Sequence, residues 1–256
     1  MIKSIKKYIY RYIGEKLYKF QNTSDDYIKW MRERGAKIGK NVMIFDPKST
    51  LLDVTRPYMI EIGNNVQITR GVIILTHGYE WSVLKNVYGD ILGSCGKVSI
   101  GNNVFIGMNT IILKGVNIGN NVIIGAGSVV THNLNDNSVY TGNPAKFVMT
   151  LDEYYEKRKS AQIIEAKEQV LQYQTRVMNK PDKMVLREFF FLFEDINDDK
   201  EIFSEYKRML GFTDNYEDSL NKFIKTRMNR PFYDIDAFIN FCNGDKYYKG
   251  KVEDKI

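Results

Sequence analysis

The sequence predicts a mostly β fold, a parallel β-helix of hexapeptide repeats, with an N-terminal amphipathic helix and a C-terminal α-helical extension. Three observations predict it. Aliphatic residues recur six apart without a slip, at Ile100, Ile106, Ile112, Ile118, Ile124 and Val130. A second set keeps the same period four places further on, at Val104, Thr110, Val116, Val122 and Ser128. Glycine follows the aliphatic residue at Gly101, Gly107, Gly119 and Gly125.

A six-residue period fits neither the 3.6-residue period of an α-helix nor the two-residue period of a strand. Each repeat is therefore expected to form one short strand and one turn, with its aliphatic residue pointing into the coil. Gly or Asn is expected to supply the turn backbone. Stacked coils would then bury a continuous column of Ile and Val.

The repeats, and the segment GAGSVVTHNLNDNSVYTGNPAKFV that closes them, resemble the left-handed β-helix, or hexapeptide-repeat, acetyltransferases. The resemblance covers roughly residues 35–148 and is closest to sugar and capsular polysaccharide O-acetyltransferases. It implies a left-handed coil, acetyl-CoA as co-substrate, and a homotrimer with active sites between neighbouring coils. It says less about the acceptor.

The N-terminal segment, residues 1–34, is predicted to form helices. Residues 1–20 place apolar side chains at steps of three and four, which indicates an amphipathic helix with a basic opposite face. We expect this helix to pack on the protein, so that any peripheral membrane association through residues 1–20 is weak. A second helix is predicted from Ser24 to Arg34, ending at Gly35.

The β-helix domain is expected to span residues 35–150, with a first, degraded repeat near Ile38. Its phase breaks once, because the 26 residues from Ile74 to Ile100 are not a multiple of six. Residues 78–97 are therefore predicted to leave the coil as a long irregular loop that begins directly after His77. Long excursions from a compact scaffold are usually functional.

Residues 151–256 are predicted to form the helical extension. Thr150 and Glu153 are spaced as a capping box, which opens a helix to about Met178. Shorter helices are expected over residues 185–194, 200–210, 216–228 and 235–242. The aromatic run 189–193 is expected in a small core rather than on an acceptor or partner surface.

Composition limits the function classes. The net charge of +6 is concentrated in residues 1–20, which does not indicate a nucleic-acid surface. Cys95 and Cys242 lie far apart and are expected to be free thiols in the cytoplasm. No apolar run is long enough to span a bilayer, and no signal peptide is expected. The chain contains no phosphate-loop motif, and its two histidines cannot supply a three-histidine zinc site, so no metal is expected.

His77 is the predicted catalytic residue. In the resembling family a histidine at this place is the general base, and imidazole suits proton transfer because its pKa lies near the working pH. The alternative is a hydrogen-bonded turn histidine. The sequence leaves open which group orients the ring, since Gly78, Tyr79 and Glu80 follow where relatives often carry acidic or His residues.

The resemblance also implies acceptor-binding and cofactor-binding residues. Asp53 aligns with an acidic residue that contacts the acceptor in sugar-acetylating relatives, although a turn-capping role is equally expected. The predicted acceptor-binding residues are Asp53, Phe105, which replaces a common tryptophan, and Glu80. The predicted cofactor-binding residues are Met108, through its backbone N–H as an oxyanion donor, Ala126, Thr131, His132 and Lys146.

The expected function is an acetyl-CoA-dependent O-acetyltransferase that acts on a sugar hydroxyl, in a cell-surface or capsular polysaccharide or its precursor. Two alternatives stay open at this point. One is an N-acetyltransferase acting on a nucleotide-linked amino sugar. The other is a non-catalytic β-helix scaffold whose helical tail binds a partner.

Overall fold

The computed structural model describes residues 19–193, 204–205, 207–209, 216–226 and 230–244. The chain divides into two compact units, Met1–Tyr154 and Tyr155–Ile256. Most of the helix predicted over residues 1–20 lies outside the described residues; within them is a 3-10 turn, η1 (Lys19–Gln21). Among the described residues, no helix is both long and apolar enough to cross a membrane.

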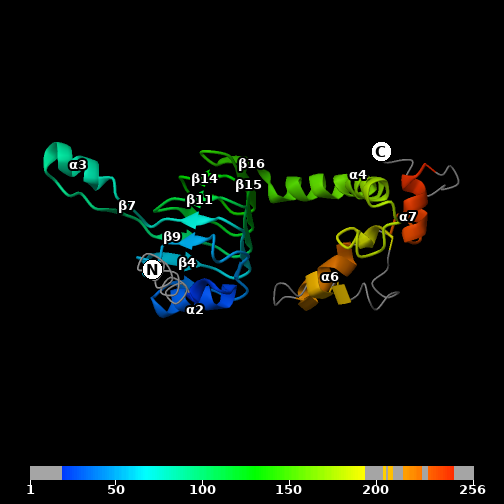
Figure 1. Ribbon diagram of the computed structural model, residues 1–256, viewed down its shortest axis with the longest axis horizontal. Helices are drawn as coiled ribbons and strands as arrows, with labels where there is room; N and C mark the ends of the chain where they lie inside the picture. The colour runs from blue at the N-terminus through cyan, green and yellow to red at the C-terminus, as the bar shows by residue number, and fades with distance from the viewer. Residues whose placement is uncertain (1–18, 194–203, 206, 210–215, 227–229, 245–256) are drawn as a thin grey trace, which may run out of the picture. The chain divides into compact units, whose positions relative to one another are not determined.

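The first unit is a left-handed β-helix of three parallel sheets, as predicted (Figure 1). Sheet A contains β1 (Lys37–Ile38), β4 (Ile60–Ile62), β9 (Val98–Ile100) and β12 (Asn117–Ile118). Sheet B contains β2 (Met43–Ile44), β5 (Val66–Ile68), β10 (Val104–Ile106), β13 (Val122–Ile124), β15 (Ser138–Thr141) and β16 (Lys146–Thr150). Sheet C contains β3 (Leu51–Leu52), β6 (Ile73–Ile74), β11 (Ile111–Ile112) and β14 (Val129–Val130).

The chain visits sheets A, B and C in turn, so the coil has three corners, which we name AB, BC and CA after the sheets that they join. Register is kept from coil to coil: Ile74 pairs with Ile112, and Ile112 pairs with Val130. A short 3-10 helix, η2 (Pro57–Met59), precedes β4 at one CA corner. Because equivalent positions lie above one another, residues far apart in sequence meet at the same corner.

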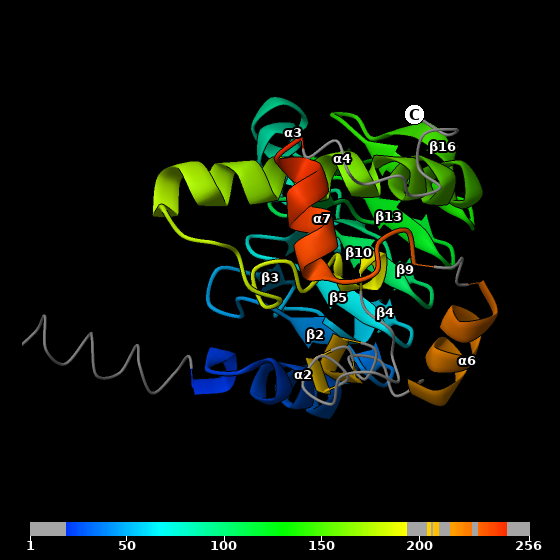
Figure 2. The same cartoon turned by 90° about the vertical axis from the view of Figure 1, so that its right-hand side faces the viewer.

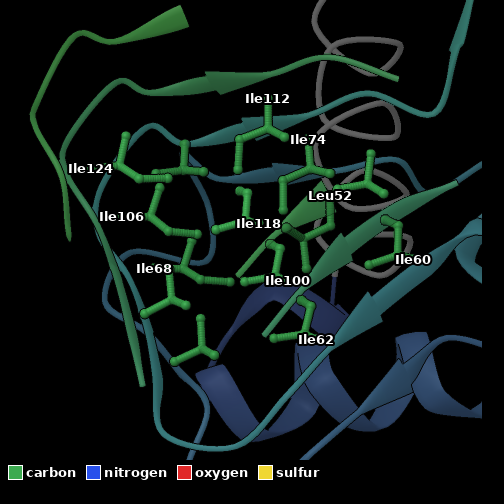
Figure 3. Close-up of a cluster of buried hydrophobic side chains, with 14 of the residues drawn as sticks. Leu52, Ile60, Ile62, Ile68, Ile74, Ile100, Ile106, Ile112, Ile118 and Ile124 are labelled. Carbon is green, nitrogen blue, oxygen red and sulfur yellow. The ribbon is translucent and has the colours of Figure 1, made fainter. Parts of the chain in front are cut away.

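The interior of the coil is the predicted aliphatic column (Figure 3). The six repeat residues between Ile100 and Val130 are at most 4% exposed. Thr110 and Ser128 occupy small interior positions and are 0% exposed. Their hydroxyls donate to the carbonyls of Gly107 and Gly125, so these polar side chains are buried with partners.

Asparagine and glycine have different roles at the AB corner. The residues with a left-handed backbone conformation there are asparagines: Asn41, Asn65, Asn103, Asn121 and Asn137. Glycine is required there for close approach: a Cβ on Gly63 would lie 2.6 Å from the Gly101 carbonyl oxygen, and one on Gly101 would lie 2.6 Å from that of Gly119. The sequence pattern did not separate these two reasons.

Helix α2 (Ser24–Glu33) covers the first coil. Thr23 caps it by accepting from Asp26 N–H, and Gly35 follows it with φ of +93°, which confirms the predicted helix. Its Tyr27 is 0% exposed and lies in the same core as the coil. Tyr27 Oη accepts from Leu52 N–H at 3.0 Å, and Ser24 Oγ accepts from Ile44 N–H at 2.9 Å. The helix thus satisfies strand N–H groups of β2 and β3 that have no coil beneath them.

A hairpin covers the opposite end of sheet B. Strand β15 pairs in parallel with β13 and antiparallel with β16, with an irregularity between Val139 and Tyr140. Figure 2 shows β2, β5, β10 and β13 rising in order toward β16. The change to antiparallel pairing ends the repeat.

The second unit is helical. Helix α4 (Leu151–Val177) opens with the predicted capping box, in which Thr150 N–H donates to Glu153 and Glu153 N–H donates to Thr150 Oγ1. Helices α6 (Tyr216–Thr226) and α7 (Ile235–Cys242) follow the predicted ranges, and the helix over 200–210 lies mostly outside the described residues.

The helix predicted over residues 185–194 is wrong. The segment forms turns and a 3-10 helix, η3 (Phe190–Leu192). Consecutive aromatic residues cannot all lie on one helical face, and the turns direct Phe190 and Phe193 into a core where they are 3% and 0% exposed. The expectation that the aromatic run builds a core is therefore confirmed for these two rings.

Candidate active site

The chain leaves the coil after His77, as the break in the repeat predicts. The excursion, residues 78–95, is called the arm below. It is not irregular: β7 (His77–Gly78) pairs antiparallel with β8 (Ser94–Cys95), and α3 (Trp81–Tyr88) lies between them. Figure 1 shows α3 projecting away from the three sheets, and no α3 residue is buried. The root of the arm therefore lies at the CA corner.

His77 and Asp53 meet at this corner. Because β3 pairs with β6, Asp53 N–H donates to Ile74 C=O at 3.0 Å, and the aspartate lies directly beside the residues that follow β6. His77 Nδ1 is 2.5 Å from Asp53 Oδ2, and the two side chains are 10% and 3% exposed. Asp53 is therefore the group that orients the His77 ring, a question that the sequence left open.

Asp53 is surrounded by donors. Its Oδ1 accepts from Thr55 N–H at 3.1 Å and Thr55 Oγ1 at 2.6 Å. Its Oδ2 accepts from Thr76 N–H and Thr76 Oγ1 as well as from His77. Burial disfavours the charged carboxylate, but the hydrogen bonds from Thr55, Thr76 and His77 outweigh it and hold the pKa of Asp53 well below its ordinary value.

An ionised Asp53 sets the tautomer of His77. Since the carboxylate can only accept, the imidazole proton is assigned to Nδ1 and Nε2 keeps a free lone pair. A histidine held in this way can accept a proton at Nε2. Both oxygens of Asp53 accept hydrogen bonds within the protein and the residue is 4% exposed, so the structure gives it an orienting contact, and the expected sugar contact stays a prediction.

Glu80 fixes the arm to the coil. Its Oε1 accepts from Lys114 Nζ at 2.6 Å, and this bond, with one from the Ser94 side chain, lowers the pKa of Glu80 to about 2. Its carboxylate also lies against Gly78, where a Cβ would collide with Oε2. Glu80 is engaged by the protein, and its acceptor contact stays a prediction.

The predicted cofactor residues fall at two corners. Met108 and Ala126 lie at the BC corner, where Gly127 N–H donates to Met108 C=O at 2.7 Å. Lys146 begins β16 near the same corner, because Ala145 N–H donates to Val129 C=O at 2.8 Å. All three side chains are exposed.

The remaining predicted residues lie elsewhere. Thr131 and His132 follow β14 at the CA corner, with Thr131 Oγ1 3.3 Å from His132 Nδ1, so they share this corner with His77. Phe105 lies on the outer face of sheet B and is 40% exposed. Within one chain, His77 and Met108 therefore lie at opposite ends of the strands of sheet C, at the CA corner and the BC corner.

Sequence reasoning missed three residues of the site: Thr55, Thr76 and Lys114. Thr76 directly precedes His77, which is a weak signal. The contact between Lys114 and Glu80 depends on the conformation of the arm, so nothing in their spacing could indicate it.

Comparisons with known proteins agree with this architecture. The family model described as Bacterial transferase hexapeptide (six repeats) matches residues 97–132. Protein CapG of Staphylococcus aureus is 44% identical over 138 residues, which are 54% of this chain and 77% of that protein. The chain belongs to the hexapeptide-repeat acetyltransferase family. It is accordingly an acyltransferase.

Two further proteins match part of the chain. "Putative acetyltransferase YvoF" of Bacillus subtilis (strain 168) is 37% identical over 109 residues, 43% of this chain and 58% of that protein. Among solved structures, a galactoside acetyltransferase in complex with coenzyme A is 26% identical and has a TM-score of 0.42, covering 57% of this chain and 82% of that one. These matches concern part of the chain only.

Proposed function

We propose that the protein is an acetyl-CoA-dependent O-acetyltransferase that acts on a sugar hydroxyl, in a cell-surface or capsular polysaccharide or its precursor. The buried pair of His77 and Asp53 carries the proposal. The family supplies acyl transfer, and the pair supplies a base for a hydroxyl nucleophile. The resemblance of the repeats to sugar-acetylating enzymes supplies the acceptor class.

In this proposal His77 Nε2 takes the proton of the acceptor hydroxyl while that oxygen bonds to the carbonyl carbon of the acetyl thioester. The carbon–sulfur bond breaks, and the imidazolium returns the proton to the leaving sulfur. Asp53 keeps Nδ1 protonated and stabilises the imidazolium charge. No acyl-enzyme is required, because the thioester is already activated.

The residues of the BC corner fit an acetyl-CoA molecule. Ala126 and Gly127 leave an open surface at this corner, which suits a narrow pantetheine chain. Lys146 is exposed, so its charge is available to a phosphate. Thr131 and His132 of a neighbouring copy would contact the same co-substrate from that copy's CA corner.

The proposal includes a homotrimer. The base lies at the CA corner and the Met108 N–H at the BC corner, at opposite ends of the strands of sheet C, so one chain does not bring them together. A neighbouring copy that brings its BC corner against this chain's CA corner would complete the site. The exposed Phe105 and Met108 supply apolar surface for such a contact. Free thiols at Cys95 and Cys242 agree with the proposed cytoplasmic location.

The test is thiol release from acetyl-CoA over a panel of sugars, oligosaccharides and nucleotide sugars. Lability of the product to mild alkali separates an O-acetyl ester from an N-acetyl amide. His77→Ala should lower turnover by about 100- to 10,000-fold with little change in acetyl-CoA binding. His132→Ala, the matched control, should weaken acetyl-CoA binding with a milder effect at saturation. Near-normal turnover by folded His77→Ala would refute the mechanism.

A further inference from the structure

Two aromatic side chains follow His77 at the root of the arm. The ring of Tyr79 lies edge-on to the His77 ring, with 5.0 Å between the centroids and 77° between the planes. Trp81 continues the group at 6.2 Å from Tyr79. Tyr79 is 65% exposed although it borders the buried His77–Asp53 pair. A large ring is thus presented to solvent beside the proposed base.

Packing does not account for this placement. Tyr79 is outside the coil core, and α3 buries none of its residues. Isolated exposed aromatic residues need no explanation, but this one contacts the catalytic histidine. Pockets that bind organic ligands are commonly lined by aromatic rings, with a few polar groups that fix orientation. Tyr79 and His77 together have that composition.

The backbone on both sides of Tyr79 is fixed. On one side, Gly78 pairs with Ser94 in the two-stranded ribbon. On the other side, Glu80 is held by Lys114 of the coil. The ring therefore needs little ordering when a ligand arrives, which favours binding.

We propose that Tyr79, extended by Trp81, is a stacking subsite for the sugar ring of the acceptor. This inference rests on the proposed function and names the part of the acceptor that the site recognises. A pyranose has an apolar face of C–H groups and a rim of hydroxyls. The C–H face lies on the aromatic ring, whose face is electron-rich, and the rim then presents one hydroxyl to His77 Nε2.

The first experiment measures acceptor KM with methyl pyranosides of glucose, galactose and their 2-acetamido analogues. Tyr79→Ala should raise KM about 10- to 100-fold, because it removes one buried aromatic ring from the complex. Tyr79→Phe keeps the ring and should stay close to wild type. Tyr88→Ala makes the same change at another exposed tyrosine of the arm, away from His77, and is the matched control. The dissociation constant of acetyl-CoA should be unchanged in all three variants.

The second experiment does not depend on turnover. The chain has two tryptophans, Trp30 and Trp81, so Trp30→Phe leaves Trp81 as the sole indole fluorophore. Titration with the best methyl pyranoside should give a saturable change in its emission, which D-glucitol, an acyclic polyol without a ring face, should not give. Adding Tyr79→Ala should raise the pyranoside concentration at the midpoint of this titration by the same factor by which it raises KM.

The outcomes separate the two hypotheses. If wild type acetylates a pyranoside while Tyr79→Ala keeps the KM of Tyr88→Ala, the stacking subsite is refuted and the proposed function stands. If Tyr79→Ala changes the oligomeric state in sedimentation, Tyr79 is a subunit contact and the inference also fails. If wild type acetylates no sugar hydroxyl, the proposed function falls and the subsite falls with it.

Discussion

Replacing Asp53 by asparagine tests whether the carboxylate positions the base. Every hydrogen bond that Asp53 makes through its side chain is accepted from a donor: Thr55 on one oxygen, and Thr76 with His77 on the other. An amide has the same shape but turns one acceptor into an N–H₂ donor. That donor must face either Thr55 or the pair of Thr76 and His77.

Both orientations have a cost that can be worked out. With the amide nitrogen toward Thr55, the Thr55 N–H loses its acceptor, which costs about 1–3 kcal/mol of stability, and His77 keeps only a neutral partner. With the nitrogen toward His77, the Thr76 N–H is left unsatisfied at a similar cost, and the ring proton is driven to Nε2. In that tautomer Nε2 cannot accept a proton. We therefore expect turnover to fall by about 100- to 10,000-fold, with acceptor KM nearly unchanged.

The assay is steady-state thiol release at saturating acetyl-CoA, with denaturant unfolding of each variant. Thr55→Val is the matched control, because it removes a hydroxyl from the Asp53 oxygen that does not contact His77. It should lose about 1 kcal/mol of stability while turnover changes less than about tenfold. A folded Asp53→Asn protein with normal turnover and a raised acceptor KM would refute the positioning role and support the sugar contact that the sequence suggested.

Three further predictions follow from the coil and from Asp53. Sedimentation should show a trimer at working concentration, since the proposed site is divided between the CA and BC corners; an active monomer would contradict this. Gly101→Ala should destabilise the coil by about 1–3 kcal/mol, because a Cβ would collide with backbone, whereas Gly93→Ala, which meets nothing within 4 Å, should be neutral in the same denaturant titration. The pKa of Asp53 is lowered on folding, so its contribution to stability is present above about pH 4 and is lost as the pH falls further. The stability difference between wild type and Asp53→Asn should accordingly shrink in acid unfolding curves, and a difference that stays constant down to the acid limit would contradict it.

The coil could be predicted from the sequence because the six-residue repeat is a local pattern. Each Ile or Val of the series needs only its own position in the six-residue period to be placed in the core, and Ile100 through Val130 are buried as that period requires. The prediction of a helix over residues 185–194 was wrong for the opposite reason. A run such as Phe189–Phe193 is apolar at every position, so its direction is decided by the core that it meets and not by its own pattern.

The site was predictable in part. His77 could be identified from the break in the repeat, and the resemblance pointed to Asp53. The two residues are 24 apart in sequence, and their contact depends on the register between β3 and β6. The role of Asp53 then follows from the donors around it, which sequence spacing cannot show. Glu80 illustrates the same limit, since its contact with Lys114 depends on how the arm leaves the coil.

Helix α2 covers the first coil, and this helps to prevent the chain from polymerising. A parallel coil has the same hydrogen-bonding edge at each end, so uncovered coils from different molecules could join end to end without limit. Tyr27 and Ser24 accept from the Leu52 and Ile44 N–H groups at one such edge, while the antiparallel β16 covers the other on sheet B. Removal of residues up to Gly35 would therefore expose unpaired backbone N–H groups at the end of the coil. The product would be fibres or insoluble protein instead of a shorter enzyme.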